Sequence, residues 1–130
     1  MIKHKIKVRG FHCDIYGHVN NARYLEFLEE VRWEWLNSMA SMEFLMKRRI
    51  SFVIVSITIH YRSAAFLNDE LEVTAELKHI TNRSGIVSQK ITRVSDSKLI
   101  SDAEVTFVLL DTQSGKSIII DEELKNMMVK

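Results

Sequence analysis

The chain has 130 residues, of which 46% are hydrophobic and 27% are charged, and its formal net charge at pH 7 is +1. This length and balance are typical of one globular domain spanning residues 1–130, and not of a disordered chain. Because the net charge is close to zero, we expect neither nucleic acid nor an anionic membrane as a partner. The single cysteine excludes an internal disulfide and suits a reducing compartment.

The first ten residues, MIKHKIKVRG, carry charges throughout and lack the apolar core of a secretion signal. No uncharged run in the sequence approaches the length of a membrane-spanning helix. We therefore expect a cytoplasmic protein without a membrane span.

The N-terminal third of the sequence predicts a strand, a polar loop and a long helix. Residues 2–9 alternate between charged and apolar side chains, as in a strand with one buried face. A polar loop follows from Gly10 to Gly17. Asn20 is a favourable N-cap residue, and from Asn21 onwards large apolar side chains recur at helical spacing. This helix is expected to bury one stripe of side chains: Tyr24, Phe27, Leu28, Val31 and Trp35.

The remainder of the chain is rich in strand patterns. Four segments combine β-branched residues with apolar–polar alternation: 51–61, 70–79, 86–94 and 99–111. In the first of them we expect Val53, Val55, Ile57, Ile59 and Tyr61 to share one face. Asp121 is expected to cap a short last helix. One long helix followed by successive strands predicts an α+β layer with a largely antiparallel sheet.

Two ionisable residues, Asp14 and His18, precede the long helix. The free N–H groups at a helix N-terminus favour a nearby carboxylate, so Asp14 has a structural interpretation as a residue that braces the loop. Its functional interpretation is a general base or nucleophile that faces a carbonyl polarised by the same N–H groups. His18 is either a second acid–base group or a brace through a backbone hydrogen bond. The residues alone favour the structural interpretation of both.

Cys13 is adjacent to Asp14, and in an extended segment the two side chains point to opposite sides. An inert small apolar side chain is therefore a simpler interpretation of Cys13 than a thiolate nucleophile paired with His18. The His, Cys, Asp and Glu residues show no spacing typical of a metal site. We expect neither a metal nor a cofactor.

The segment RGFHCDIYGHVNNARYLEFLEEVRWEWL resembles hotdog-fold acyl-CoA thioesterases of the 4-hydroxybenzoyl-CoA thioesterase-like group. Their motif is an aspartate, a short spacer, the run His-Val-Asn-Asn and a tyrosine three residues later, which here correspond to Asp14, His18–Asn21 and Tyr24. The likeness continues through FVIVSITIHYRSAAFLND, SGIVSQKIT and DAEVTFVLLD and so covers nearly the whole chain. It implies the hotdog fold, in which an antiparallel β-sheet wraps a long central helix.

The resemblance also implies a site. In the family the motif aspartate is the catalytic base or nucleophile, which corresponds to Asp14, and backbone N–H at the helix start, near Asn21, holds the thioester oxygen. His18 completes the catalytic set, and Tyr24 is implied to contact the substrate.

The same resemblance implies a homodimer or homotetramer, because active sites of this family lie between two subunits. The turn that contains Arg83, Ser84 and Gly85 corresponds to the region that faces the partner's aspartate and coenzyme A. Arg83 is then expected to meet a phosphate and Ser84 to place the water. A plain hairpin turn is the alternative interpretation of these residues.

Together these inferences predict an acyl-CoA thioesterase that converts medium- to long-chain fatty acyl-CoA to free fatty acid and coenzyme A. One alternative is a hydratase or dehydratase on the same fold, which would need a His/Glu or His/Asp pair at the helix. The other is a non-catalytic acyl-CoA-binding subunit, against which the presence of Asp14 argues. For a long acyl chain we expect an apolar tunnel lined by the strand that starts at Phe52 and by the helix stripe Tyr24, Phe27, Leu28 and Val31.

Overall fold

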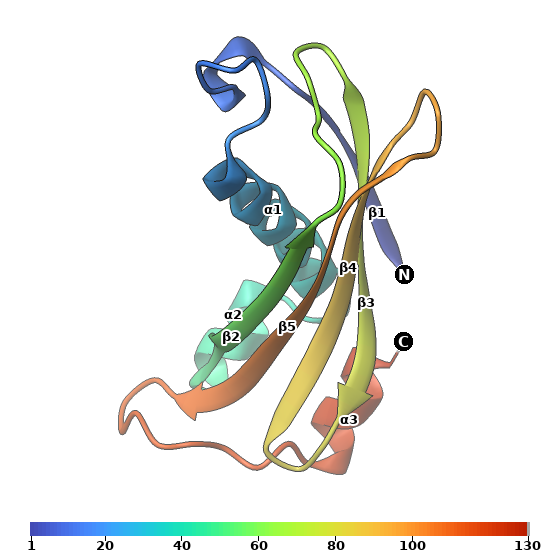
Figure 1. Ribbon diagram of the computed structural model, residues 1–130. Helices are drawn as coiled ribbons and strands as arrows, with labels where there is room; N and C mark the ends of the chain where they lie inside the picture. The colour runs from blue at the N-terminus through green and yellow to red at the C-terminus, as the bar shows by residue number, and fades with distance from the viewer. Residues whose placement is uncertain (130) are drawn as a thin grey trace.

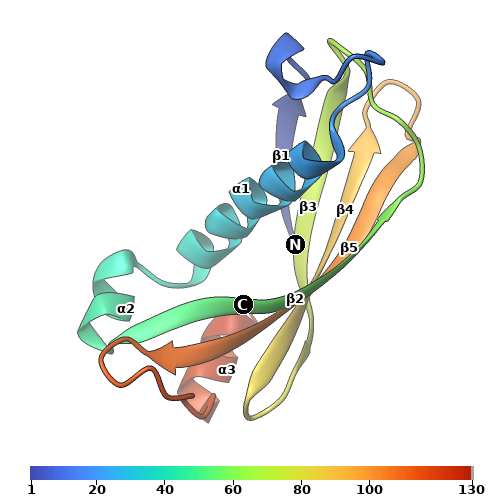
Figure 2. The same ribbon diagram turned by 60° about the vertical axis from the view of Figure 1, so that its left-hand side comes forward.

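A computed structural model describes residues 1–129 of the chain. Five antiparallel strands form one sheet in the order β1-β3-β4-β5-β2, and the long helix α1 crosses the concave face of this curled sheet (Figure 1 and Figure 2). The predicted combination of one long helix and an antiparallel sheet is therefore confirmed. The elements are β1 (Ile2–Lys7), a 3-10 turn (Gly10–His12), α1 (Asn21–Met39), α2 (Met42–Lys47), β2 (Ile50–Tyr61), β3 (Glu70–Ile80), β4 (Ser84–Arg93), β5 (Leu99–Asp111) and α3 (Glu122–Met128).

Helix α1 begins where the sequence predicts it. The side chain of Asn20 accepts a hydrogen bond from Ala22 N at 3.0 Å, which satisfies one of the free N–H groups of the first turn. The helix ends at Met39. Its buried side chains are those of the predicted stripe: Tyr24, Phe27, Leu28, Val31 and Trp35.

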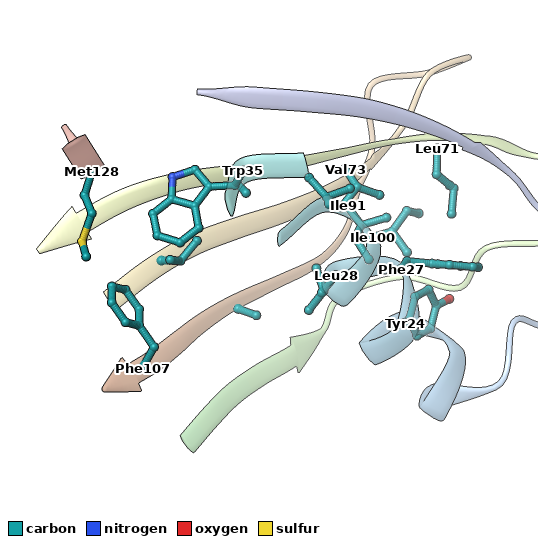
Figure 3. Packing of buried hydrophobic residues seen from close by; sticks show 14 of the residues in the cluster. Tyr24, Phe27, Leu28, Trp35, Leu71, Val73, Ile91, Ile100, Phe107 and Met128 are labelled. Atoms are coloured by element: carbon teal, nitrogen blue, oxygen red, sulfur yellow. The ribbon is translucent and has the colours of Figure 1, made fainter. Parts of the chain in front are cut away.

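The core lies between this stripe and the concave face of the sheet. Strands β3, β4 and β5 alternate between buried and more exposed positions, as expected for strands with one covered face. Trp35 of α1 faces Phe107 of β5 across the core, with ring centroids 5.8 Å apart (Figure 3). Aromatic pairs at this separation stabilise the contact beyond the area they bury.

Strand β2 departs from the prediction that its odd-numbered residues share one face. Ile54 pairs with Phe107 and Ser56 pairs with the adjacent Thr106, so Val55 forms a β-bulge. The extra residue switches the alternation of side chains. Positions opposite the buried residues of β5 are consequently even-numbered before the bulge (Phe52, Ile54) and odd-numbered after it (Ile57, Ile59).

Two short helices complete the fold. Helix α2 was not predicted from the sequence, although Ser41 caps it by accepting a hydrogen bond from Phe44 N at 3.0 Å. The predicted cap of the last helix is confirmed, because Asp121 accepts from Leu124 N at 2.9 Å. Within residues 1–129, no helix combines the length and the apolar character needed to cross a bilayer.

Candidate active site

The loop before α1 is folded around the side chain of Asp14. Oδ1 of Asp14 accepts hydrogen bonds from Tyr16 N at 2.9 Å and from His18 N at 3.4 Å. A tight turn closes the loop from Asp14 O to Gly17 N, and Gly17 adopts φ +79°, a conformation that glycine reaches without strain. The structural interpretation of Asp14 as a loop brace is therefore confirmed. It uses one carboxylate oxygen, and Oδ2 has no hydrogen-bond partner among residues 1–129.

His18 supports this loop through its main chain, as the structural interpretation predicts. Its carbonyl accepts a hydrogen bond from Asp14 N at 2.8 Å, and its ring packs edge-on against Phe66 with centroids 5.1 Å apart. The side chain of Cys13 is turned away from this region: its thiol lies 3.7 Å from Arg9 O and it packs against the core. The expected opposite orientation of Cys13 and Asp14 is therefore confirmed.

A pocket of about 280 Å³ lies between this loop, the start of α1 and the segment after β2. The predicted residues Asp14, His18, Asn21 and Tyr24 all line it. As the first residue of the helix, Asn21 has a backbone N–H without a partner among residues 1–129, because the N-cap carbonyl and side chain of Asn20 serve the next two amides. A carboxylate and a free helix N-terminal donor thus border the same pocket.

Tyr24 contributes a further donor to this pocket. Its hydroxyl oxygen accepts a hydrogen bond from Ala65 N at 3.1 Å, so its proton remains available for a bond of its own. Burial raises the pKa of Tyr24 above the ordinary tyrosine value, which keeps the hydroxyl protonated at neutral pH. The Tyr24 hydroxyl is therefore equipped to hydrogen-bond an oxygen atom in the pocket.

Residues 61–64, at the end of β2, form the opposite wall of the pocket, and this wall was not predicted from the sequence. Tyr61 Oη lies 3.4 Å from the carbonyl oxygen of Asn21 and so links β2 to the start of the helix. Arg62 donates from Nε to Oδ2 of Asp102 at 2.8 Å, and this hydrogen bond holds the pKa of Asp102 below its ordinary value. Contacts between segments far apart in the chain, such as the hydrogen bond from Val19 N to Ala65 O at 2.9 Å, bring these residues to Asp14, so no local sequence pattern identifies them.

The loop that continues this wall is fixed to the sheet by Arg93 of β4. Arg93 Nη1 donates to Oδ2 of Asp69 at 3.0 Å and to the carbonyl oxygen of Ala64 at 3.2 Å. The same oxygen of Asp69 accepts from Phe66 N at 2.9 Å. Because Ala64 lines the pocket and Phe66 contacts His18, this network holds the far wall in place relative to Asp14.

The predicted substrate-binding turn lies far from Asp14 in the same chain. Strand β3 runs from Glu70, beside the end of β1, to Ile80, where the turn to β4 begins. These ten steps of about 3.3 Å place Arg83, Ser84 and Gly85 roughly 30 Å from the Asp14 end of the sheet, as the opposite positions of the two loops in Figure 1 show. One chain alone therefore does not bring the turn and Asp14 together.

The turn itself is well ordered by its own hydrogen bonds. Thr81 Oγ1 accepts from Arg83 N at 3.1 Å and from Ser84 N at 3.0 Å. Arg83 Nη1 also donates to Ser117 Oγ at 3.1 Å. The hairpin interpretation of this segment is thus confirmed as a description of the single chain. The side chain of Arg83 is exposed in this turn and can still meet a ligand or another subunit.

A larger apolar groove of about 340 Å³ lies farther along α1, between that helix and β2. The helix side chains that line it include Trp33 and Leu36, and Phe52, Ile54 and Ile57 line it from β2. The expected tunnel lining is therefore corrected in part, although Phe52 does line the groove. Tyr24 belongs to the Asp14 pocket, and Phe27, Leu28 and Val31 fill the solid core, so none of these four side chains lines the groove between α1 and the edge strand β2.

Residues 1–129 contain no group of three or more His, Cys, Asp or Glu side chains arranged to hold a metal ion. The chemistry available in the Asp14 pocket is that of a carboxylate, an imidazole, a phenol and backbone N–H donors. Such a set can activate water or attack a carbonyl carbon while stabilising the charge that develops on the carbonyl oxygen.

Comparison with known proteins agrees with this architecture. The chain is 44% identical over 124 residues to the long-chain acyl-CoA thioesterase FadM of Escherichia coli strain K12, covering 95% of this chain and 94% of that one. It is 33% identical over 99 residues to the acyl-CoA thioester hydrolase YbgC of Escherichia coli O6:H1, covering 75% and 73%.

Among solved structures, that of the probable thioesterase YbaW from Escherichia coli superposes over all of both chains with a TM-score of 0.92 and 44% identity. The Staphylococcus aureus protein SAV2348, solved in complex with CoA, has a TM-score of 0.87 over 98% of this chain and 80% of its own. At 18% identity, this second likeness shows the fold alone. The sequence model of the thioesterase-like superfamily matches residues 8–128. With a match over nearly its whole length and a five-stranded sheet curled around one long helix, the chain belongs to the thioesterase-like superfamily and has the hotdog fold.

Proposed function

We propose that the protein hydrolyses medium- to long-chain fatty acyl-CoA to free fatty acid and coenzyme A in the cytoplasm. The observation that carries this proposal is that the free oxygen of Asp14 belongs to a pocket also bordered by the free N–H of Asn21. Membership of the superfamily and the names of FadM and YbgC support the same reaction class.

In the proposed mechanism the thioester carbonyl oxygen accepts a hydrogen bond from Asn21 N–H, and the Tyr24 hydroxyl contacts the substrate. Asp14 either takes a proton from the attacking water or attacks the carbonyl carbon itself, forming an anhydride that water then hydrolyses. In both routes the C–S bond breaks, and the coenzyme A thiolate leaves and takes up a proton. A positioned base accounts for about 10²–10⁴ in rate and one oxyanion donor for about 10²–10³. His18 borders the pocket and is available for proton transfer.

The proposed active unit is a homodimer or a larger homo-oligomer. β2 is an edge strand of 12 residues, and its exposed apolar side chains include Ile54, Val55 and Ile57. A long apolar edge of this kind favours pairing with a second copy. Antiparallel pairing of two β2 strands about a two-fold axis joins the two sheets and makes the contact self-complementary.

This arrangement supports a shared active site. Val53 near the start of β2 pairs with Val108, and Val108 pairs with Ser84, so the turn containing Ser84 lies at the start of β2. Tyr61 at the other end of β2 lines the Asp14 pocket. Antiparallel pairing sets the start of one β2 beside the end of the other, so a partner's turn comes to the Asp14 end of the sheet. We assign Arg83 to a phosphate of coenzyme A, and Ser84 with Gly85 to the substrate and its water.

The choice of a fatty acyl group follows from the groove between α1 and β2. Each buried methylene group contributes about 0.8 kcal/mol, so an apolar groove favours longer chains until it is filled. The groove of about 340 Å³ continues past Trp33 into a neighbouring pocket of about 420 Å³ bordered by α2. Discrimination between neighbouring chain lengths is expected to be weak, because area alone separates them.

Thiol release from purified protein tests the proposal. Substrates are a saturated series from acetyl-CoA to palmitoyl-CoA, with benzoyl-CoA and 4-hydroxybenzoyl-CoA for comparison. We expect kcat/KM to rise with chain length and to be lower for both aromatic thioesters. If aromatic thioesters are preferred, or if acetyl-CoA equals palmitoyl-CoA, the fatty acyl assignment is wrong. Binding of acyl-CoA without thiol release would identify a non-catalytic subunit, and hydration of an enoyl-CoA a hydratase.

A further inference from the structure

The groove between α1 and β2 is apolar except at one place. Glu29 and Arg32 are the charged side chains in its lining, and Trp33, Phe52 and Ile57 are among the apolar ones. Arg32 is half-buried, whereas Glu29 is exposed. A cation in such a setting requires hydrogen-bond partners, because burial of an unpaired charge is costly.

A buried glutamine holds the guanidinium of Arg32 in place. Gln89 of β4 is fully buried, and its amide nitrogen donates to the carbonyl oxygens of Leu28 at 3.1 Å and Thr74 at 3.2 Å. Its amide oxygen accepts from Arg32 Nη1 at 3.0 Å. Since both hydrogens of the Gln89 amide are committed to carbonyls, its oxygen is oriented toward Arg32. The guanidinium is therefore positioned by a satisfied polar contact that reaches the core.

This contact uses only part of the hydrogen-bonding capacity of Arg32. A guanidinium has five N–H donors, and among residues 1–129 Arg32 has one hydrogen bond to a side chain and no carboxylate within ion-pair distance. Burial lowers the pKa of Arg32, and the charge of Glu29 opposes that shift. The side chain nonetheless stays charged at neutral pH. An unsubstituted acyl chain in the groove would displace water from the remaining N–H groups without replacing its hydrogen bonds.

The position of Arg32 along α1 sets how far from the thioester an acyl chain in the groove would meet the guanidinium. Asn21, Leu25 and Arg32 follow one another at helical spacing on the same side of α1. Arg32 is 11 positions after Asn21, a rise of about 16 Å at 1.5 Å per residue, and its side chain tilts back toward the helix N-terminus. An extended chain advances about 1.2 Å per bond, as the backbone does, so Arg32 meets an acyl chain roughly 10 to 14 carbons from the thioester.

The charge of the groove also indicates which substituent fits. Glu29 lines the same groove, so the two charged side chains sum to zero, and a carboxylate on the substrate would face Glu29 as well as Arg32. A neutral oxygen atom accepts a hydrogen bond from Arg32 without that repulsion. A hydroxyl or keto group therefore suits the site better than a carboxylate does.

We propose that Arg32 is a specificity-determining residue that selects acyl chains bearing a hydroxyl or keto oxygen about 10 to 14 carbons from the thioester. This inference rests on the proposed function, since it places the acyl chain of a thioester substrate in the groove. It adds an oxygenated class of fatty acyl groups to the substrates.

The test compares 12-hydroxydodecanoyl-CoA with dodecanoyl-CoA, and 6-hydroxyhexanoyl-CoA with hexanoyl-CoA, in a thiol-release assay. The six-carbon pair is too short to reach Arg32 and reports the effect of a hydroxyl elsewhere. For each pair, the hydroxyl effect is kcat/KM of the hydroxy compound divided by kcat/KM of its unsubstituted parent. In the wild-type protein we expect this ratio to be about tenfold larger for the twelve-carbon pair than for the six-carbon pair. Arg32→Met is expected to remove this excess. Arg23→Met, which removes a cation from α1 outside the groove, is expected to keep it. Dodecanedioyl-CoA is expected to gain less than the hydroxy compound.

If the excess hydroxyl effect of the twelve-carbon pair is the same in the wild-type protein and in Arg32→Met, the inference is wrong. The proposed function still holds in that case, provided that the saturated series is hydrolysed. If no acyl-CoA is hydrolysed, the proposed function fails, and calorimetric titration with the same four compounds decides the inference separately. Tighter binding of 12-hydroxydodecanoyl-CoA that depends on Arg32 supports it, and equal binding overturns it. Light scattering completes the test: an unchanged mass for Arg32→Met supports the inference, and dissociation overturns it by assigning Arg32 to contact between copies.

Discussion

Gly85 and the ring of Phe107 are in direct contact across adjacent strands, and the contact leaves no room for a side chain. A Cβ on Gly85 would lie 2.3 Å from Cζ of Phe107. The two residues are opposite each other in the pairing of β4 with β5, and the Phe107 ring is held by Trp35 and Phe52. Packing of the core thus accounts for glycine at the start of β4, whatever its proximity to a substrate.

Gly85→Ala is therefore expected to destabilise the protein. The new methyl group forces the Phe107 ring to move within a close-packed core, which typically costs about 1–3 kcal/mol. Urea unfolding followed by tryptophan fluorescence measures the change. Gly10→Ala is the matched control, because a Cβ there has no atom within 4 Å, and its stability should stay close to that of the wild-type protein. Equal stability of the two variants would show that the ring yields freely.

Asp14→Asn is expected to abolish thiol release while leaving the fold and acyl-CoA binding nearly intact. Asparagine keeps an oxygen that can accept from Tyr16 N, so the loop is retained, but the amide cannot act as a base or nucleophile. We expect kcat to fall by about 10²–10⁴. Circular dichroism and titration with a saturated acyl-CoA verify folding and binding. Turnover close to that of the wild-type protein would refute the mechanism.

Cys13→Ser is expected to retain most of the activity. The thiol points toward Arg9 O and does not line the Asp14 pocket, so its replacement changes no group that touches the substrate. The measurement is kcat/KM for the same substrate used with Asp14→Asn. A loss as deep as that of Asp14→Asn, in a folded protein, would instead support a cysteine nucleophile.

The protein is expected to be at least dimeric, with β2 in the interface. Light scattering at micromolar concentration should give at least twice the chain mass of 15.1 kDa. Val55→Lys places a charge on the β2 edge and is expected to lower both the mass and the activity. Ile119→Lys is a matched control, since Val55 and Ile119 are each 55% exposed and Ile119 lies outside β2. A fully active wild-type monomer would contradict the shared site.

Asp102→Asn is expected to lower the melting temperature by about 2–4 °C at pH 7. Arg62 holds the pKa of Asp102 below the ordinary value of about 3.9. A lowered pKa in the folded state means that the stabilisation is complete above about pH 4 and is lost as the pH falls through the lowered value. Melting curves from pH 7 into the acid range should therefore show a constant difference that begins to shrink below about pH 4. Glu104→Gln, in an exposed pair with Lys78, provides the comparison. A difference that stays constant as the pH falls below about 4 would exclude this linkage.

Features that depend on neighbours in the sequence could be predicted from it. The start of α1 follows from Asn20, whose side chain bonds the amide two residues on, and the buried stripe of α1 follows from helical spacing. The loop around Asp14 is closed by hydrogen bonds within five residues, so its bracing role and the opposite orientation of Cys13 were also accessible. The signal for α2 is also local, because Ser41 stands at its N-cap position.

Other features depend on how distant segments pair, and only the tertiary structure decided them. The bulge at Val55 arises where β2 meets β5, and it changes which side chains of β2 face the core. Pairing of β2 with β5 brings Tyr61 and Arg62 to the Asp14 pocket, and the length of β3 separates the Arg83 turn from Asp14. The sequence by itself therefore determined most of the elements and the loop around Asp14, whose hydrogen bonds are local. The tertiary structure decided the far wall of the pocket and the groove containing Arg32, because strand register and helix placement depend on contacts between residues far apart in the chain.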